Sequence, residues 1–450
     1  MLRKLVALAV ILVSIQIASG QENYTPQQLT LQDCIKIALQ RNTNVLQAQY
    51  SAQSQDAHVM SAYGGLLPTF SANAQFQYAS RQSPAGYVVV GGTSIPVSNS
   101  SINRTYTAGV TADYTLFNGF ANYATVNQAN SSSQNADLTF ERAKQNAVFQ
   151  ATQAYLTVFN DRDQLKINED NLKRDQQQLE SIKESNAVGS ASLAQVYQQQ
   201  SQVSQDEYSL VQAKNKYDQD QASLKFFLGI PVTDNAVFAD STVKSQIDTT
   251  EFVLVNQRFS QSAQLIEKAL QSRPDYQAAQ ANLNSSKSGL TIAEAAYSPV
   301  IDAFGQYGIN GPQTNLINQN KSLYAGLSIS IPILNGFQTQ TNIQLADVAV
   351  KSSEQTLDAT QRQVQLDVYS ALLNLNASEK AYESAVNAVA YNKINLETAQ
   401  EKFRIGGATL LDVLIANAGY TLALSSQVSA AYNYISAKQQ MEFAVGTINY

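Results

Sequence analysis

The sequence predicts a mixed α and β membrane protein, in which four strands per chain form part of a trimeric 12-stranded β-barrel that continues into a long α-helical coiled-coil barrel. Three observations predict this fold class. One long unit occurs twice, two segments in each unit alternate apolar and polar residues, and apolar residues at heptad spacing fill much of the remainder. The composition agrees, because only 14% of the 450 residues are charged, against about 25% in soluble domains.

Residues 1–20 have the pattern of a cleaved secretory signal peptide. Two basic residues precede an apolar run, and small residues occupy positions 18–20 at the expected cut. The run is too short to span a bilayer, and no later segment has about 18 consecutive apolar residues, which excludes an α-helical membrane protein. The only cysteine, Cys34, lies too far from the cut to carry a lipid, so we expect no lipid anchor.

A tandem repeat organises the rest of the chain. Pro68 and Pro299 lie 231 residues apart, whereas Asn118 and Asn335 lie 217 residues apart. The offset changes at one place, within residues 78–104, where the first copy carries a longer loop. One break in an otherwise constant offset indicates two copies of one large unit rather than a solenoid of short repeats.

Each copy is predicted to run helix, strand, strand, long helix, long helix. We place the first repeat at 21–229, with strands at about 69–79 and 105–117 and a helical hairpin whose tip is near 189. An equatorial linker follows at 230–258. The second repeat occupies 259–450, with strands at about 300–310 and 322–333 and a hairpin tip near 406. The residues at 80–103 are rich in Gly, Pro and Ser, which is typical of an outward-facing loop.

The strand segments carry the sharpest local signal. In 69–79 every even position is aromatic or Ala, whereas Ser, Asn and Gln fill the odd positions from 71 to 77. Alternation over about ten residues with an uncharged polar face is typical of transmembrane β-strands. A soluble half-buried strand alternates too, but usually over about five or six residues and with Lys on its wet face. The pattern in 300–310 is noisier, because Phe304 has the wrong parity.

Turn and helix signals follow each strand pair. Asn118-Gly119 and Asn335-Gly336 are predicted strand-to-helix turns, because Asn-Gly tolerates positive φ. Apolar residues then recur at every seventh position, which favours left-handed supercoiling; Val158, Leu165, Leu172 and Leu179 form one such series. The narrow apolar stripes leave Gln, Asn and Ser on the other faces, so we expect one buried seam and one wet face.

Four membrane strands cannot stand alone in lipid, because the hydrocarbon contains no water to satisfy open sheet edges. Closure therefore requires further copies of the chain. Two copies give eight strands, whose lumen side chains would fill, whereas three give twelve and leave room for a polar pore. This argument favours a homotrimer.

The chain resembles the TolC-type outer-membrane efflux protein family. The resemblance rests on both repeats, the Pro before each first strand, the Asn-Gly-Phe exits, and the string from Phe403 to Leu414. It implies an outer-membrane channel that spans the periplasm, docks onto a periplasmic adaptor (membrane fusion) protein and an inner-membrane transporter, and passively conducts small molecules or polypeptides in a tripartite efflux or type I secretion system. It implies no catalytic residue, cofactor or metal.

The resemblance also implies a gate at the periplasmic tip. The candidate tip residues are Val188, Gly189, Phe403, Arg404, Ile405, Gly406, Gly407 and Asp412. Similar proteins close this end with tyrosine and arginine contacts, but here Phe403 and Ala408 occupy those positions, which puts such hydrogen bonds in question. Asp412 matches an acid of a cation-preferring ring; it equally suits a solvated acid at a helix start.

Two other classes of function remain to be weighed. A soluble periplasmic coiled-coil scaffold or adaptor explains the heptads and the signal peptide, but not four charge-poor alternating strands. An enzyme is disfavoured, since the chain has one His, His58, one Cys, and no recognisable carboxylate motif. The net charge of −6 argues against a nucleic-acid partner.

Overall fold

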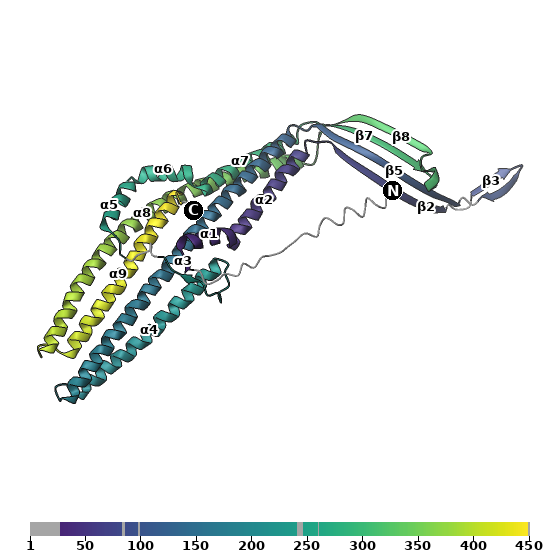
Figure 1. Cartoon of the computed structure of the whole chain (residues 1–450). Helices are drawn as coiled ribbons and strands as arrows, with labels where there is room; N and C mark the ends of the chain where they lie inside the picture. Colours follow the sequence, from purple (N-terminus) through teal and green to yellow (C-terminus); the bar gives the residue numbers. More distant parts are fainter. Residues whose placement is uncertain (1–27, 83–85, 98–99, 241–245, 260, 449–450) are drawn as a thin grey trace.

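The computed structural model describes residues 28–82, 86–97, 100–240, 246–259 and 261–448. The molecule is elongated, with a β-sheet at one end and the tips of two helical hairpins at the other (Figure 1). Within these ranges no helix has the length and apolar character needed to cross a membrane. The predicted signal peptide, residues 1–20, lies outside the described residues.

Two long helical hairpins make up most of the structure. The helices are α1 (Leu31–Arg41), α2 (Thr43–Gly64), α3 (Ala121–Ala187), α4 (Leu193–Phe227), α5 (Thr249–Arg258), α6 (Ser262–Ser272), α7 (Pro274–Ala295), α8 (Gln338–Arg404) and α9 (Leu410–Val445), with a short 3-10 turn at Thr314–Leu316. Helices α3 and α8 each contain 67 residues, which makes each roughly 100 Å long at 1.5 Å per residue. Helix α4 turns back along α3, α9 turns back along α8, and α2 and α7 pack near the sheet.

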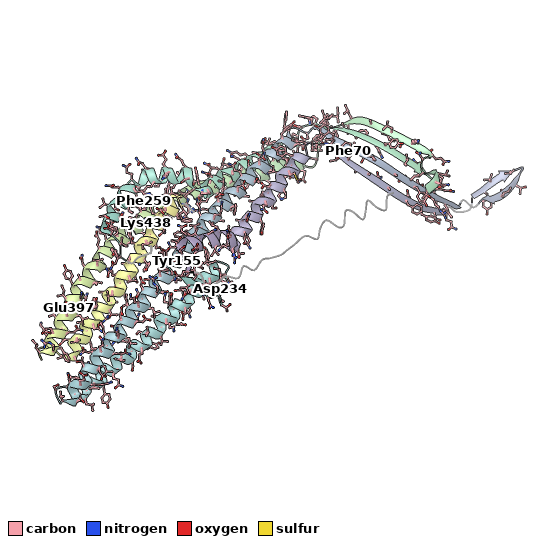
Figure 2. All side chains as sticks on the ribbon, in the orientation of Figure 1. Phe70, Tyr155, Asp234, Phe259, Glu397 and Lys438 are labelled. Atoms are coloured by element: carbon pink, nitrogen blue, oxygen red, sulfur yellow. The ribbon has the colours of Figure 1, made fainter. Side chains whose placement is uncertain are left out.

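The largest apolar cores lie half-way along the molecule. Tyr155 and Phe159 of α3 are fully buried against Cys34 of α1, while Phe252 of α5 packs edge-on against Tyr434 of α9. A two-residue parallel pairing of β1 (Gln28–Leu29) with β6 (Val237–Phe238) closes this region. Figure 2 shows the labelled Tyr155 in this middle region, Phe70 where the sheet meets the helices, and Glu397 far along the second hairpin.

An antiparallel four-stranded sheet forms the far end, in the order β2-β5-β7-β8. The strands are β2 (Thr69–Gln82), β5 (Ser100–Phe117), β7 (Val300–Gly311) and β8 (Asn320–Ser330). The central pair, β5 and β7, joins the two halves of the chain, and β2 and β8 are the edges. Every residue of β2 is exposed, and so is nearly all of β8, so the chain itself covers neither strand.

The two faces of this sheet differ in polarity. Phe70 and Phe76 lie on the same face as Tyr106, and the rings of Phe76 and Tyr106 are 4.7 Å apart. On the opposite face the hydroxyls of Ser71 and Thr111 share a hydrogen bond of 2.5 Å. The alternation read from the sequence therefore corresponds to one apolar and one polar face.

A β-bulge and a glycine explain the irregular parts of that alternation. The register shifts between Thr115 and Phe117, which returns Phe117 to the apolar face beside Ile301. Phe304 lies on the polar face, where its ring covers Gly326 of β8; a Cβ at Gly326 would come within 2.8 Å of that ring. The parity of Phe304 is thus a feature of packing rather than noise.

The strand limits differ from those predicted. Strand β2 continues to Gln82 rather than ending near 79, and β5 begins at Ser100 rather than near 105, because the two remain paired to their ends. Strand β8 ends at Ser330 rather than near 333, since Pro332 has no N–H to donate and β7 offers no partner beyond Val300.

The expected loop at 80–103 contains a β-hairpin instead. Strands β3 (Gly86–Val90) and β4 (Thr93–Val97) pair through a turn in which Gly91 and Gly92 both have positive φ. The hairpin projects beyond the sheet (Figure 1), and its described apolar side chains are exposed. A Gly-Gly turn between β-branched residues is a hairpin signal, which the general Gly and Pro content of the segment concealed.

Candidate functional site

The joint between sheet and helices is a left-handed two-residue turn. Gly119 and Phe120 have φ of 65° and 67°, and Gly336 and Phe337 repeat this at 63° and 64°. Positive φ was predicted for Asn-Gly, but it falls on Gly and the following Phe, which is uncommon for a non-glycine residue. The asparagine side chains bond to the first turn of the helix that follows: the amide of Asn118 donates to Asn122 Oδ1 at 2.9 Å, and the backbone N–H of Asn122 donates to Asn118 Oδ1 at 3.3 Å.

The two joints differ in how tightly they are enclosed. A Cβ on Gly119 would lie 2.5 Å from Ser298 Cβ and 2.9 Å from the carbonyl oxygen of Ala295, whereas a Cβ on Gly336 would meet nothing within 4 Å. Only glycine therefore fits the first joint on both conformational and steric grounds.

Both hairpin tips are capped turns. Gly189 and Gly406 adopt positive φ of 80° and 77°, which ends each first helix. Ser192 then caps α4, and Thr409 caps α9. Val188 and Ile405 stand at corresponding positions with 81% and 68% of their surface exposed, so both tips present an apolar side chain to their surroundings.

The charged residues at the second tip are engaged locally. Arg404 donates to both carboxylate oxygens of Glu401 on the same helix, at 2.9 and 2.6 Å. Asp412 Oδ2 accepts from the backbone N–H of Thr409 at 2.8 Å and from its hydroxyl at 2.7 Å. The backbone hydrogen bond from Thr409 holds the pKa of Asp412 below its ordinary value. Within one chain, Asp412 is thus a helix-capping acid.

An apolar cluster joins the two tips. It contains Leu179 and Ile182 of α3, Val196 and Val203 of α4 and Leu410 of α9, with Phe403 of α8 packed against it. Leu410 is 2% exposed. Of the sequence-predicted tip residues, Phe403 enters this cluster, whereas Arg404, Gly407 and Asp412 remain exposed. The hairpins are therefore held at the tip by apolar contact, in which the ring of Phe403 takes part.

Further from the tips than this cluster, the interface between the two hairpins is polar. Gln164 of α3 donates to the backbone oxygen of Ser425 of α9 at 2.9 Å, and Tyr432 of α9 donates to Asp163 at 2.9 Å. Such contacts exchange readily with water, so the seam between α3 and α9 is built differently from an apolar coiled-coil interface.

A buried network lies in this seam, and sequence reasoning missed it. The guanidinium of Arg174 donates to Asn171, Asn417 and Thr421 at 3.0 to 3.2 Å. Asp175 is 3% exposed and accepts from Asn417 of α9 at 2.9 Å. No single helix shows this arrangement in its sequence, because the partners on α3 and α9 lie more than 240 positions apart.

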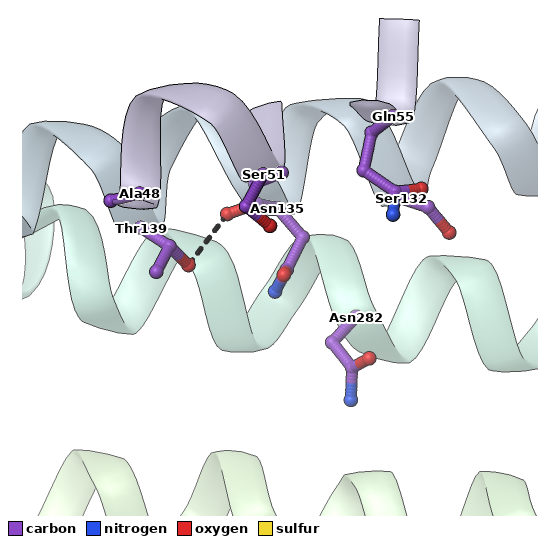
Figure 3. Close-up of a pocket in the computed structure, with 8 residues that line it drawn as sticks. Ala48, Ser51, Gln55, Ser132, Asn135, Thr139 and Asn282 are labelled. Atoms are coloured by element: carbon purple, nitrogen blue, oxygen red, sulfur yellow. Dashed lines mark hydrogen bonds between the residues drawn. The ribbon is translucent and has the colours of Figure 1, made fainter. Parts of the chain in front are cut away.

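A pocket of about 300 Å³ lies between α2, α3 and α7 (Figure 3), and in its lining the hydroxyl of Thr139 donates to the backbone oxygen of Asn135. The Asn135 amide in turn donates to the backbone oxygen of Ala278 at 2.7 Å. The lining is neutral and polar, which suits a wet gap between helices.

Comparison with known proteins identifies the family. The family model described as outer membrane efflux protein matches residues 34–230 and 265–447. The chain belongs to the outer membrane efflux protein family. It is 25% identical over 334 residues to outer membrane protein TolC of Vibrio cholerae, covering 73% of this chain and 74% of that protein. Outer membrane efflux protein BepC of Brucella suis is 22% identical and covers 99% of this chain and 90% of its own length.

Solved structures share the fold. A membrane protein of Pseudomonas aeruginosa superposes with a TM-score of 0.79 at 17% identity, covering 92% of this chain and 93% of its own. The predicted TolC-type resemblance is confirmed, and the chain is an outer-membrane efflux channel. The family is one of channels rather than enzymes, and the alternative of a soluble periplasmic scaffold or adaptor is not favoured.

Proposed function

We propose that three copies of the chain close a 12-stranded barrel through their edge strands, as the last strand of one copy pairs with the first strand of the next. The observation that carries this proposal is the uncovered sheet: β2 and β8 are open edges, and β2 is exposed along its whole length. Neighbouring strands run antiparallel throughout, so β8 of one copy meets β2 of the next in the same sense. Closure satisfies edge groups that lipid cannot.

The polarity of the sheet sets the orientation of this barrel. Leu323, Leu327 and Ile329 share the face that carries Phe70, and all are more than 60% exposed. This face meets outer-membrane lipid, and the Ser, Thr, Asn and Gln face lines the lumen. The paired helical hairpins, with α3 and α8 equal in length, continue the lumen as an α-helical tube, which agrees with a tandem repeat.

The channel serves a tripartite efflux or type I secretion system and passes small molecules or polypeptides passively. Its tips, where Val188 and Ile405 are exposed, dock a periplasmic adaptor, and an inner-membrane transporter supplies the energy. Residues 1–20 direct export and are cleaved, and no lipid is attached. The tip is the gate: the two hairpins slide along their polar seam, and three Asp412 side chains form an acidic ring.

A pair of arginine substitutions on one strand tests the barrel. Leu327→Arg places a charge on the proposed lipid face, at a cost of about 2–4 kcal/mol near the bilayer centre, whereas Ser328→Arg points into the lumen. We expect the first to abolish recovery of membrane-inserted trimer and the second to preserve assembly and shift ion selectivity in planar bilayers. Equal behaviour of both variants, or a wild type that stays monomeric and never conducts, would refute the proposal.

A further inference from the structure

A pair of buried acids lies beside the Arg174 network. Asp175 of α3 and Asp206 of α4 are 3% and 6% exposed, and their carboxyl groups are within hydrogen-bonding reach of one another. Both oxygens of Asp175 are already acceptors: Oδ1 takes the Gln199 amide at 3.0 Å, and Oδ2 takes the Asn417 amide at 2.9 Å. Two ionised carboxylates in such a place would repel strongly.

The two oxygens of Asp206 differ. Its Oδ1 accepts from the Gln202 amide at 3.0 Å, whereas its Oδ2 is buried with no N–H or O–H donor. An unpartnered buried oxygen next to a carboxylate is the arrangement expected when that oxygen itself carries a proton. Burial, together with the hydrogen bond and charge of Asp175, raises the pKa of Asp206 to about 7.

We propose that Asp206 carries a proton on Oδ2 and donates it to Asp175, and that this proton stabilises, in a pH-sensitive manner, the acceptor through which the first hairpin holds α9 of the second. The inference rests on the proposed function, because it assigns a regulation to the same hairpin seam. Asp175 is the shared element: α4 reaches it through Gln199 and Asp206, and α9 reaches it through Asn417. Losing the proton at Asp206 therefore disturbs the acceptor that holds the second hairpin.

The charges around the pair fix the sign. On α3 the charged groups that act on Asp206 are Asp175, which favours the protonated form, and Arg174, which opposes it, and on α4 the Gln202 amide is neutral. The α9 partners of this network, Asn417 and Thr421, bond to Asp175 and Arg174 and are also neutral. The closed seam binds a proton that a solvated Asp206 would release near pH 4. The closed arrangement is therefore favoured at low pH and weakens as pH rises toward about 7, where Asp206 ionises even in the closed seam.

Infrared spectroscopy of the full-length assembled protein tests the proton directly. A protonated carboxyl has a C=O stretch that a carboxylate lacks, so the difference spectrum between about pH 5 and about pH 9 should contain this band. Asp206→Asn should remove it, and Asp218→Asn, an exposed acid on the same helix, should not. If the Asp206→Asn variant fails to assemble, Asp175→Asn is used in its place. That variant removes the neighbouring carboxylate and should move the titration of Asp206 to lower pH. A spectrum unchanged by these variants overturns the inference.

Amide hydrogen exchange tests the fastening without relying on conduction. After correction for intrinsic rates, exchange in 199–206 and 413–421 should quicken as pH rises, by up to about tenfold per pH unit while the pair titrates. Asp206→Asn, whose amide still donates to Asp175, should remove this dependence. If the protection of these amides is the same at about pH 5 and about pH 9, the inference is overturned, even if the channel conducts. If their protection depends on pH but the protein never conducts, the inference is supported and the proposed function is contradicted instead.

Discussion

Replacing the glycine of each strand-to-helix joint by alanine should destabilise the two joints unequally. Both positions have φ near +65°, which costs a non-glycine residue about 1–2 kcal/mol. At Gly119 the new methyl group would also lie 2.5 Å from Ser298 Cβ and 2.9 Å from the backbone oxygen of Ala295, and overpacking of this kind costs about 1–3 kcal/mol more. We expect losses of about 2–5 kcal/mol for Gly119→Ala and about 1–2 kcal/mol for Gly336→Ala.

Thermal unfolding in detergent, followed by circular dichroism at one scan rate, should rank the proteins as wild type, then Gly336→Ala, then Gly119→Ala. Adding Ser298→Gly to Gly119→Ala removes the obstructing Cβ and should restore part of the loss. Equal midpoints for the two single variants, or no recovery in the double variant, would show that Ser298 does not pack on the joint as described.

Three further outcomes concern the tip. Leu410→Ala empties a buried site, should cost about 2–5 kcal/mol locally, and should raise the resting conductance in planar bilayers; an unchanged resting conductance would mean that the apolar cluster does not hold the tip closed. Asp412→Asn should weaken the preference of the channel for cations in planar bilayers. Unchanged ion selectivity would mean that Asp412 only caps α9. Cysteines introduced at Val188 and Ile405 can be cross-linked selectively, because the chain's own Cys34 is buried, and the cross-link should block transport. Full transport activity after cross-linking would rule out dilation of the tip.

The strands and long helices could be predicted because their periodicities are local. Alternation located all four sheet strands, but the bulge at Leu116 and the ring of Phe304 over Gly326 depend on the neighbouring strand. The hairpin at 86–97 was missed because its turn residues also suit a loop. What a single segment determines was predictable, and what a partner strand determines was not.

The candidate site was harder for the same reason. Gln199 and Asp206 read as wet surface residues of a polar helix, yet Gln199 is fully buried. Their burial depends on packing against α3, which no helical period within α4 reveals. The positive φ of Phe120 was also unpredictable, since aromatic residues seldom adopt it and only the path from strand to helix imposes it.

Helix α3 starts four residues after β5 ends, and the turn between them is occupied by residues with little freedom to change. The connection is too short and too constrained to absorb a rotation of the helix relative to the strand. In the proposed channel, a torque applied to the hairpin tips by a docked adaptor would be transmitted along helices of roughly 100 Å to the wall of the barrel. Under that proposal, the fold couples events at the tips mechanically to the membrane-embedded sheet.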